Sequence, residues 1–163
     1  YGSTVIWNGS VGFDGFATVV DRVIEKYFSQ PNYYKIDGCP VFMIYDAENL
    51  IKGLGGIEKT QKAIAYFREK TKQAGFPNLH LQFTIWRENW LNLSGFDSNM
   101  AGSTKDVVSL LGADSVTHYQ FVHFANIDRD YNEILDDVKK EWERIDKEYS
   151  VPYFPHIFAD IIQ

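Results

Sequence analysis

Short apolar runs and longer amphipathic segments alternate along the chain. Five apolar runs cover residues 4–7, 41–45, 79–85, 115–121 and 153–158, so their starts lie 37, 38, 36 and 38 positions apart. A strand followed by a helix at near-constant spacing is typical of parallel βαβ units. Sites in such folds lie where the strands end, so the residues directly after each run are the first candidates for chemistry.

The segments between the runs show helical periodicity. Predicted helices cover roughly 14 residues ending near Phe28, residues 58–74, a short segment that Ser103 can cap, and a long segment after Asp130. Residues 36–38 predict a turn. The run 41–45 is apolar at every position, which predicts a strand that is buried on both faces.

Five strands and four helices fit two architectures. One is an open doubly wound sheet. The other is a (β/α)8 barrel of the TIM type, which takes about 250 residues, so that this chain of 163 residues would supply about five βα units. In that case the remainder of the barrel, or another chain, is expected to complete the fold, because an open edge exposes unpaired strand groups. Residues 1–163 are expected to form a single domain, part of such a barrel.

Composition and charge limit the classes of partner that the protein is expected to bind. The formal charge of −6 and the pI of about 5.1 argue against an electrostatic nucleic-acid binder. No run of 18 apolar residues is present, so no membrane span is expected. Cys39 stands alone and is expected to be a small buried hydrophobe. The four histidines show no zinc-site spacing, and we expect no metal or other cofactor.

Four motifs in a fixed order carry a resemblance to a known family. The main one covers residues 33–46 and reads YYKIDGCPVFMIYD, and further stretches are 27–33, 112–119 and 152–155. Together they resemble the signature of the WbsX-like proteins, also called glycoside hydrolase family 99-like, over nearly the whole chain. The resemblance implies a (β/α)8 barrel that acts on α-linked glycans, mannose-containing glycans among them. Its partner would be a glycan or polysaccharide substrate.

The same resemblance implies a reaction and leaves alternatives open. Glycosidase members of the family are endo-acting retaining enzymes whose two catalytic glutamates lie on a later strand, so the catalytic pair is expected outside this chain. Glu141 and Glu143 do not replace that pair, because they flank Trp142 inside a predicted helix. The alternatives are a WbsX-type glycosyltransferase of polysaccharide biosynthesis, a non-catalytic carbohydrate-binding protein, or an unrelated open α/β domain. A hydrolase would be periplasmic or extracellular, and a transferase cytoplasmic.

The candidate substrate-binding residues follow the apolar runs, since sugar sites combine aromatic surfaces with a few placed polar groups. They are Trp7, Asn8, Tyr45, Asp46, Trp86, Glu88, Tyr119 and Asp160. Tyr119 matches a tyrosine of the family pattern; otherwise it would be a core aromatic residue. Asp46 could instead cap the next helix. Glu88 and Asp46 are the best carboxyl pair inside the chain for glycosidase chemistry. His118 is expected to point toward the helices, opposite to Tyr119.

Overall fold

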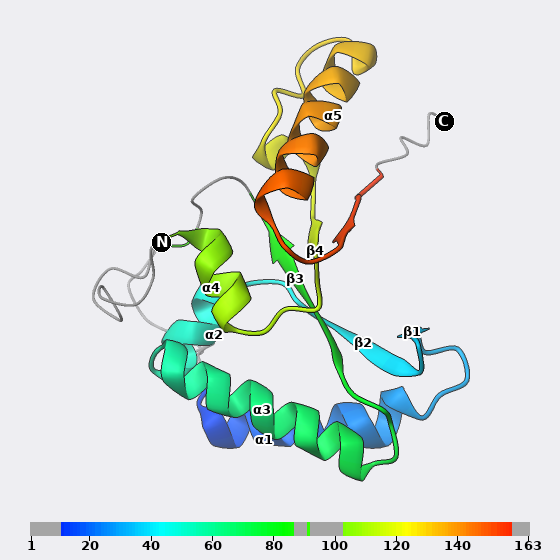
Figure 1. Cartoon of the computed structure of the whole chain (residues 1–163), viewed down its shortest axis with the longest axis vertical. Coiled ribbons are helices and arrows are strands. Elements are labelled where there is room, and N and C mark those ends of the chain that lie inside the picture. The colour runs from blue at the N-terminus through cyan, green and yellow to red at the C-terminus, as the bar shows by residue number, and fades with distance from the viewer. Residues whose placement is uncertain (1–10, 87–90, 92–102, 158–163) are drawn as a thin grey trace, which may run out of the picture.

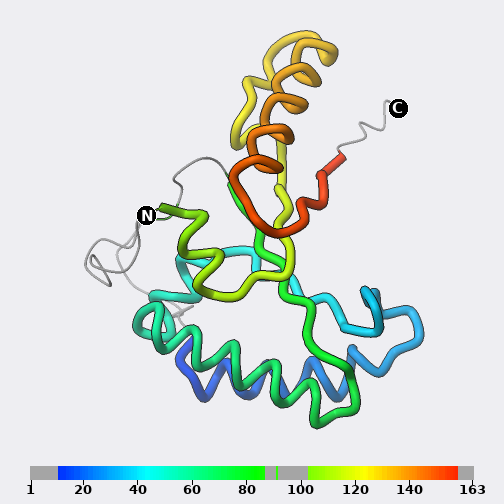
Figure 2. The backbone as a smooth tube through the Cα atoms, in the orientation of Figure 1, coloured from blue at the N-terminus to red at the C-terminus, as the bar shows by residue number. Residues whose placement is uncertain are grey.

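The computed structural model describes residues 11–86, 91 and 103–157 as a sheet of strands that adjoin in chain order. The parallel strands are β2 (Cys39–Ile44), β3 (His80–Ile85), β4 (Ser115–His118) and β5 (Tyr153–Phe154). Figure 2 shows their backbones following one another from cyan to red. A doubly wound sheet reverses its strand order at a switch point, and the described strands show no reversal. The described part is therefore an α/β half-barrel, as the TIM-type prediction requires.

Helices fill the connections between the strands. They are α1 (Phe13–Val23) with its π-helical extension η1 (Ile24–Phe28), α2 (Ala47–Leu54), α3 (Ile57–Gln73), α4 (Thr104–Leu110), the 3-10 turn η2 (Phe121–His123) and α5 (Tyr131–Glu148). Figure 1 shows α1 and α3 side by side at one end of the molecule, while α5 stands at the opposite end beyond β4.

Local sequence signals account for several of these elements. The helix predicted over 58–74 is α3, and the side chain of Ser103 caps α4 by accepting from the Asp106 backbone N–H. The predicted turn closes a hairpin, in which Asp37 and Gly38 have φ values of 50° and 78° and join β1 (Lys35–Ile36) antiparallel to β2. Asp-Gly is favoured in such a turn because both central residues need positive φ.

The helix α2 lies in a glycine-rich stretch, since it contains Gly53 and is followed by Gly55 and Gly56. The helix ends at Gly55, which adopts a left-handed conformation with φ of 84°. A glycine in that position is a common helix stop, so the glycines mark the end of a helix that begins after Asp46.

The main core lies between the helices and one face of the sheet. Phe67 of α3 is at its centre, with its ring centroid 6.1 Å from that of Phe16, 5.9 Å from Phe28 and 5.1 Å from Phe42. Phe83 of β3 is fully buried on the same side. These contacts join α1, η1, α3 and the sheet, so the helices cover a single face of the described strands.

The opposite face of the sheet is partly exposed and partly polar. Met43 is 49% exposed, so the prediction that the second apolar run is buried on both faces is wrong. An apolar run shows that a strand can be buried, but not which layers cover it. On this face His80 Nε2 lies 2.8 Å from Ser115 Oγ. Gln82 Nε2 donates to the same oxygen at 3.0 Å. Cys39, expected to be buried, is only half-buried; it is the first residue of β2 and pairs with Ile36 in the hairpin.

Arg68 of α3 ties together the starts of two strands. Its guanidinium donates to the carbonyl of Leu79 at 2.6 Å, to the carbonyl of Gly112 at 2.6 Å and to Asp114 Oδ2 at 2.8 Å. The same Asp114 oxygen accepts from the Leu81 backbone N–H at 2.7 Å. One guanidinium therefore bridges the residues that directly precede β3 and β4. This bridge supports the register of the two strands, and the register in turn sets the position of their carboxyl ends.

Candidate functional site

Three aromatic side chains predicted as site residues meet where the strands end. Tyr45 directly follows β2, Trp86 follows β3 and Tyr119 follows β4. The ring centroids of Tyr45 and Trp86 are 4.7 Å apart, those of Tyr45 and Tyr119 are 5.0 Å apart, and those of Trp86 and Tyr119 are 6.0 Å apart. Parallel strands place their carboxyl ends at one edge of the sheet, and this edge brings together residues that are far apart in the sequence.

A fourth ring, that of His123, joins these three. Its centroid lies 4.6 Å from that of Trp86 and 6.2 Å from that of Tyr119. His123 comes from η2 in the connection between β4 and α5. Sequence reasoning missed it, because it is one of four scattered histidines; its only signal was a position four residues after Tyr119. We call Tyr45, Trp86, Tyr119 and His123 the strand-end cluster.

The cluster combines accessible rings with buried polar atoms that lack partners. Tyr45 and Tyr119 are 44% and 41% exposed, whereas Trp86 and His123 are partly buried. The Nε2 atom of His123 is buried and has no hydrogen-bond partner. The buried hydroxyl of Thr84 also has none, and Thr84 lies on the same face of β3 as Trp86 because alternate strand residues point the same way. Unpaired buried polar atoms are rare in folded proteins and call for a ligand or water.

Asp46 has a structural task at the start of α2. Its Oδ1 accepts from the Asn49 backbone N–H at 2.9 Å, and its Oδ2 accepts from Asn49 Nδ2 at 2.6 Å. Desolvation raises the pKa of the neighbouring Tyr45, and Tyr119 and Asp46 act in the same direction. The Tyr45 hydroxyl therefore stays protonated at neutral pH and can donate a hydrogen bond. The other predicted site residues, Trp7, Asn8, Glu88 and Asp160, lie outside the described residues.

His118 points away from the cluster and toward the helices, as predicted. It is 3% exposed; its Nδ1 lies 2.8 Å from the Tyr153 hydroxyl, and its Nε2 lies 3.4 Å from Glu141 Oε1 without a hydrogen bond between them. Arg144 donates to both oxygens of Glu141, at 2.6 and 2.8 Å. We call His118, Tyr153, Glu141 and Arg144 the buried polar network.

Burial and charge set the protonation states in this network. Burial lowers the pKa of His118, although Glu141 acts in the opposite direction. Burial by itself would raise the pKa of Glu141, but the Arg144 guanidinium, which donates to both carboxylate oxygens, and the neighbouring His118 outweigh it and bring the pKa to about 2. At neutral pH the network therefore holds a neutral histidine beside a carboxylate that is neutralised by Arg144. It fastens β4 and β5 to α5 directly behind Tyr119.

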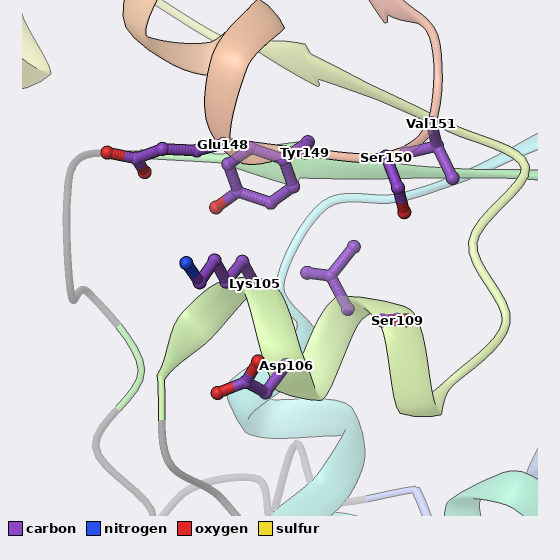
Figure 3. A pocket seen from close by; sticks show the side chains of 8 residues that line it. Lys105, Asp106, Ser109, Glu148, Tyr149, Ser150 and Val151 are labelled. Atoms are coloured by element: carbon purple, nitrogen blue, oxygen red, sulfur yellow. The ribbon is translucent and has the colours of Figure 1, made fainter.

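One hollow lies between two helices, and another lies beside η2. The first, of about 200 Å³, lies between α4 and the end of α5, and Figure 3 shows Lys105 and Tyr149 on its opposite walls. A larger one of about 450 Å³ adjoins η2, and we call it the loop pocket. Its lining includes Gln120, Phe121, Val122, Ile127, Arg129 and Ile134.

Within residues 11–86, 91 and 103–157, no group of three His, Cys, Asp or Glu side chains is placed so that it could hold a metal ion. In the same part of the chain, no helix combines the length and the apolar character needed to cross a membrane. The side chains that the strand-end cluster offers are aromatic rings, two phenol hydroxyls and one imidazole.

Comparison with known proteins points to one family. The family model described as glycosyltransferase WbsX matches residues 14–159, a range that contains every described strand and the whole strand-end cluster. Neither a curated protein nor a solved structure matches the chain. The resemblance found in the sequence motifs is therefore confirmed by the family comparison.

Proposed function

Because the chain belongs to the glycosyltransferase WbsX family, and is therefore a carbohydrate-active protein, we propose that its strand-end cluster binds a sugar ring of a glycan substrate. The observation that carries this proposal is the meeting of Tyr45, Trp86, Tyr119 and His123 at the ends of three neighbouring strands. Rigid strand ends hold such side chains in a fixed geometry, which a binding site needs.

The chemistry of the cluster suits a sugar. The exposed faces of Tyr45 and Tyr119 offer electron-rich surfaces for the C–H groups of a pyranose ring. The hydroxyls of the same tyrosines can exchange hydrogen bonds with sugar hydroxyls.

For the reaction, we propose endo-acting retaining hydrolysis of α-linked glycans, mannose-containing glycans among them, by the complete protein. That mechanism uses two carboxyl groups about 5–5.5 Å apart. Asp46 is the described carboxylate nearest in sequence to a cluster residue, and its oxygens already bind Asn49. We therefore place the catalytic pair outside the described residues, and assign substrate binding to this part of the chain.

A second candidate reaction is glycosyl transfer, and the description of the matched family favours it. The two reactions differ in their donor, since a transferase of this kind would consume a nucleotide sugar. Incubating the full-length protein with an α-linked mannan oligosaccharide, with and without nucleotide sugars, separates them. Shorter oligosaccharides in the absence of a nucleotide sugar support hydrolysis, whereas donor-dependent lengthening supports transfer and contradicts our proposal.

The binding proposal is tested by titrating the same oligosaccharide into the full-length protein and its variants. We expect Trp86→Ala and Tyr119→Ala each to weaken binding by about tenfold or more, which corresponds to about 1.4 kcal/mol. Tyr119→Phe keeps the ring and removes the hydroxyl, so a loss of roughly threefold is expected.

The matched control is Tyr34→Ala, which truncates a 65% exposed tyrosine in the segment leading to the hairpin. It should leave the affinity unchanged. Circular dichroism checks that each variant is folded. Unchanged affinity in both folded alanine variants of the cluster would remove the strand-end cluster as the sugar site.

A further inference from the structure

The hollow between α4 and the end of α5, which we call the helix groove, shares no residue with the strand-end cluster. One wall consists of residues of α4 between Lys105 and Ser109, and the other of residues 148–151. Its volume of about 200 Å³ lies below the range of about 300–1,000 Å³ that is usual for drug-sized ligands. The helix groove therefore has room for a single ring-sized group.

The helix groove offers hydrogen-bond donors on both walls. Lys105 of α4 is exposed and takes part in no ion pair with the other described residues. On the opposite wall, burial raises the pKa of Tyr149 to about 12, so its hydroxyl stays protonated at neutral pH and can donate. Figure 3 shows this hydroxyl and the Lys105 ammonium turned toward the same end of the hollow, and Ser150 on the wall that carries Tyr149.

Two carboxylates supply acceptors, and neighbouring side chains hold both of them. Asp106 Oδ2 accepts from Ser103 Oγ at 2.8 Å, and Glu148 Oε2 accepts from Arg144. Each of these bonds occupies one oxygen, whereas an ionised carboxylate has acceptor positions on both. A side chain that is already held loses little conformational freedom when a ligand binds. The acceptors of the helix groove are thus partly ordered before binding.

The charges around the helix groove balance. Glu148 is paired with Arg144 of the same helix, and the lining contains one further cation, Lys105, and one further anion, Asp106. A phosphate or a free carboxylate therefore meets no excess of positive charge, and a cation meets no excess of negative charge. The balance favours a ligand without net charge that both donates and accepts hydrogen bonds.

The rest of the lining is apolar. Val108 is 1% exposed, and Val151 and Tyr149 are half-buried. Sites for sugars combine such surfaces, which contact the C–H groups of a pyranose ring, with a few placed donors and acceptors for its hydroxyls. The size, the balanced charge and the mixed lining thus fit one neutral polyol ring. Because the chain belongs to a carbohydrate-active family, we take that ring to be a sugar.

We propose that the helix groove is a second carbohydrate site, which binds one pyranose residue of a glycan separately from the strand-end cluster. The two sites have no residue in common, so this inference does not depend on the cluster being a sugar site. Because a polysaccharide repeats its sugars, a protein with two sugar sites can hold one polymer at both, which raises the overall affinity when the geometry allows it.

The test is an NMR titration of the full-length protein with methyl α-D-mannopyranoside. The methyl signals of Val108 and Val151 report on the helix groove, and the Trp86 indole signal reports on the strand-end cluster. We expect the ligand to shift all three. In a Trp86→Ala variant the ligand should still shift the valine signals, at the same half-saturating concentration, because the two sites share no residue.

Variants assign the valine shifts to the helix groove. Ser109→Trp places a large side chain on its wall and should abolish the ligand-induced valine shifts without changing the shift of Trp86. Tyr149→Phe keeps the ring and removes the hydroxyl, so it should weaken binding at the valine signals by about threefold. The matched control is Ser29→Trp, which changes an exposed serine at the end of η1 and should leave both sites intact. Circular dichroism checks that each variant is folded.

The outcomes separate this inference from the proposed function. A shift of Trp86 without any valine shift would overturn the second site and leave the strand-end cluster standing. Valine shifts without a shift of Trp86 would support the second site and contradict the cluster as a sugar site, and the absence of all three shifts would contradict both. Valine shifts that persist in folded Ser109→Trp, or that inorganic phosphate reverses by competition, would also overturn the sugar assignment of the helix groove.

Discussion

Two neighbouring residues of one strand end face opposite environments. Tyr119 is 41% exposed among the rings of the strand-end cluster, and His118 is 3% exposed in the buried polar network. Strand geometry forces this contrast, because successive side chains leave the backbone on opposite sides. His118, on the face of β4 opposite to the strand-end cluster, is titratable. Its protonation should therefore affect the stability of the fold.

We expect acid to weaken the fold through the buried polar network. The pKa of His118 is lower in the folded protein than the ordinary 6.5, so its stabilising contribution is complete above 6.5 and is lost as the pH falls below it. The pKa of Glu141 falls from 4.5 to about 2, so its contribution is complete above 4.5 and is lost as the pH falls toward 2. Both lowered pKa values therefore predict a melting temperature that decreases from neutral to acidic pH.

Thermal unfolding followed at about pH 7.5 and about pH 5 tests this prediction. In His118→Gln the difference in melting temperature between the two pH values should be at most about half that of the unsubstituted protein. His80→Gln changes a histidine on the open face of the sheet, outside the network, and should keep the full difference. A His118→Gln variant with an undiminished pH dependence would contradict the assignment.

At the scale of elements, caps decide where helices begin beside the site. Asp46 begins α2 directly after Tyr45, so the carboxylate that sequence reasoning offered as a sugar ligand is also the N-cap of a helix. The backbone N–H groups of the first helical turn need acceptors, and Asp46 supplies one. The cap thereby holds the backbone in place directly after β2, next to Tyr45 of the strand-end cluster.

We expect Asp46→Ala to lower the free energy of unfolding by about 1 kcal/mol, the usual cost of losing an N-cap. Asp46→Asn keeps an oxygen that can accept from the Asn49 backbone N–H, so it should remain close to the unsubstituted protein. Urea unfolding measures both. If Asp46 acts only as a cap, Asp46→Asn binds the glycan normally; a stable Asp46→Asn variant with weakened binding would make Asp46 a sugar ligand as well.

At the scale of the whole molecule, the described part contains two hydrophobic cores of unequal size. The larger core joins the sheet to α1, α2, α3 and α4. The smaller one consists of Phe121, Ala125, Ile134 and Val138, with Phe124 and Trp142 packed against it. The helix α5 takes part in both, since Ile145 belongs to the larger core. The connection that carries His123 and lines the loop pocket also supplies Phe121 and Ala125 of the smaller core.

Small cores open at lower free energy than large ones, so we expect hydrogen exchange to be faster in residues 121–138 than in α3. The substitutions Val138→Ala and Val20→Ala remove the same atoms from fully buried sites, one in each core. Each should cost about 2 kcal/mol. Val138→Ala should accelerate exchange around η2 and the first half of α5, and leave α3 protected. Acceleration of equal size in α3 would show that the two cores unfold as one.

The amino-acid sequence by itself determined the parts of the fold that depend on local patterns. The apolar runs located β2, β3, β4 and β5, and the periodic stripe located α3 to within about one residue at each end. The rule that parallel strands end at one edge also placed Tyr45, Trp86 and Tyr119 among the candidates. These features follow from neighbouring residues in the chain, which is why a single sequence predicts them.

Only the tertiary structure decided what depends on partners distant in the sequence. Strand order excluded a doubly wound sheet among the described strands, and the placement of the helices left Met43 exposed. Packing of η2 beside the strand ends brought His123 to Trp86, and the connection after β4 enclosed the loop pocket. No local sequence pattern predicts these features. An apolar residue or a lone histidine looks the same in the sequence whether it lies in a core, on an exposed face or in a site.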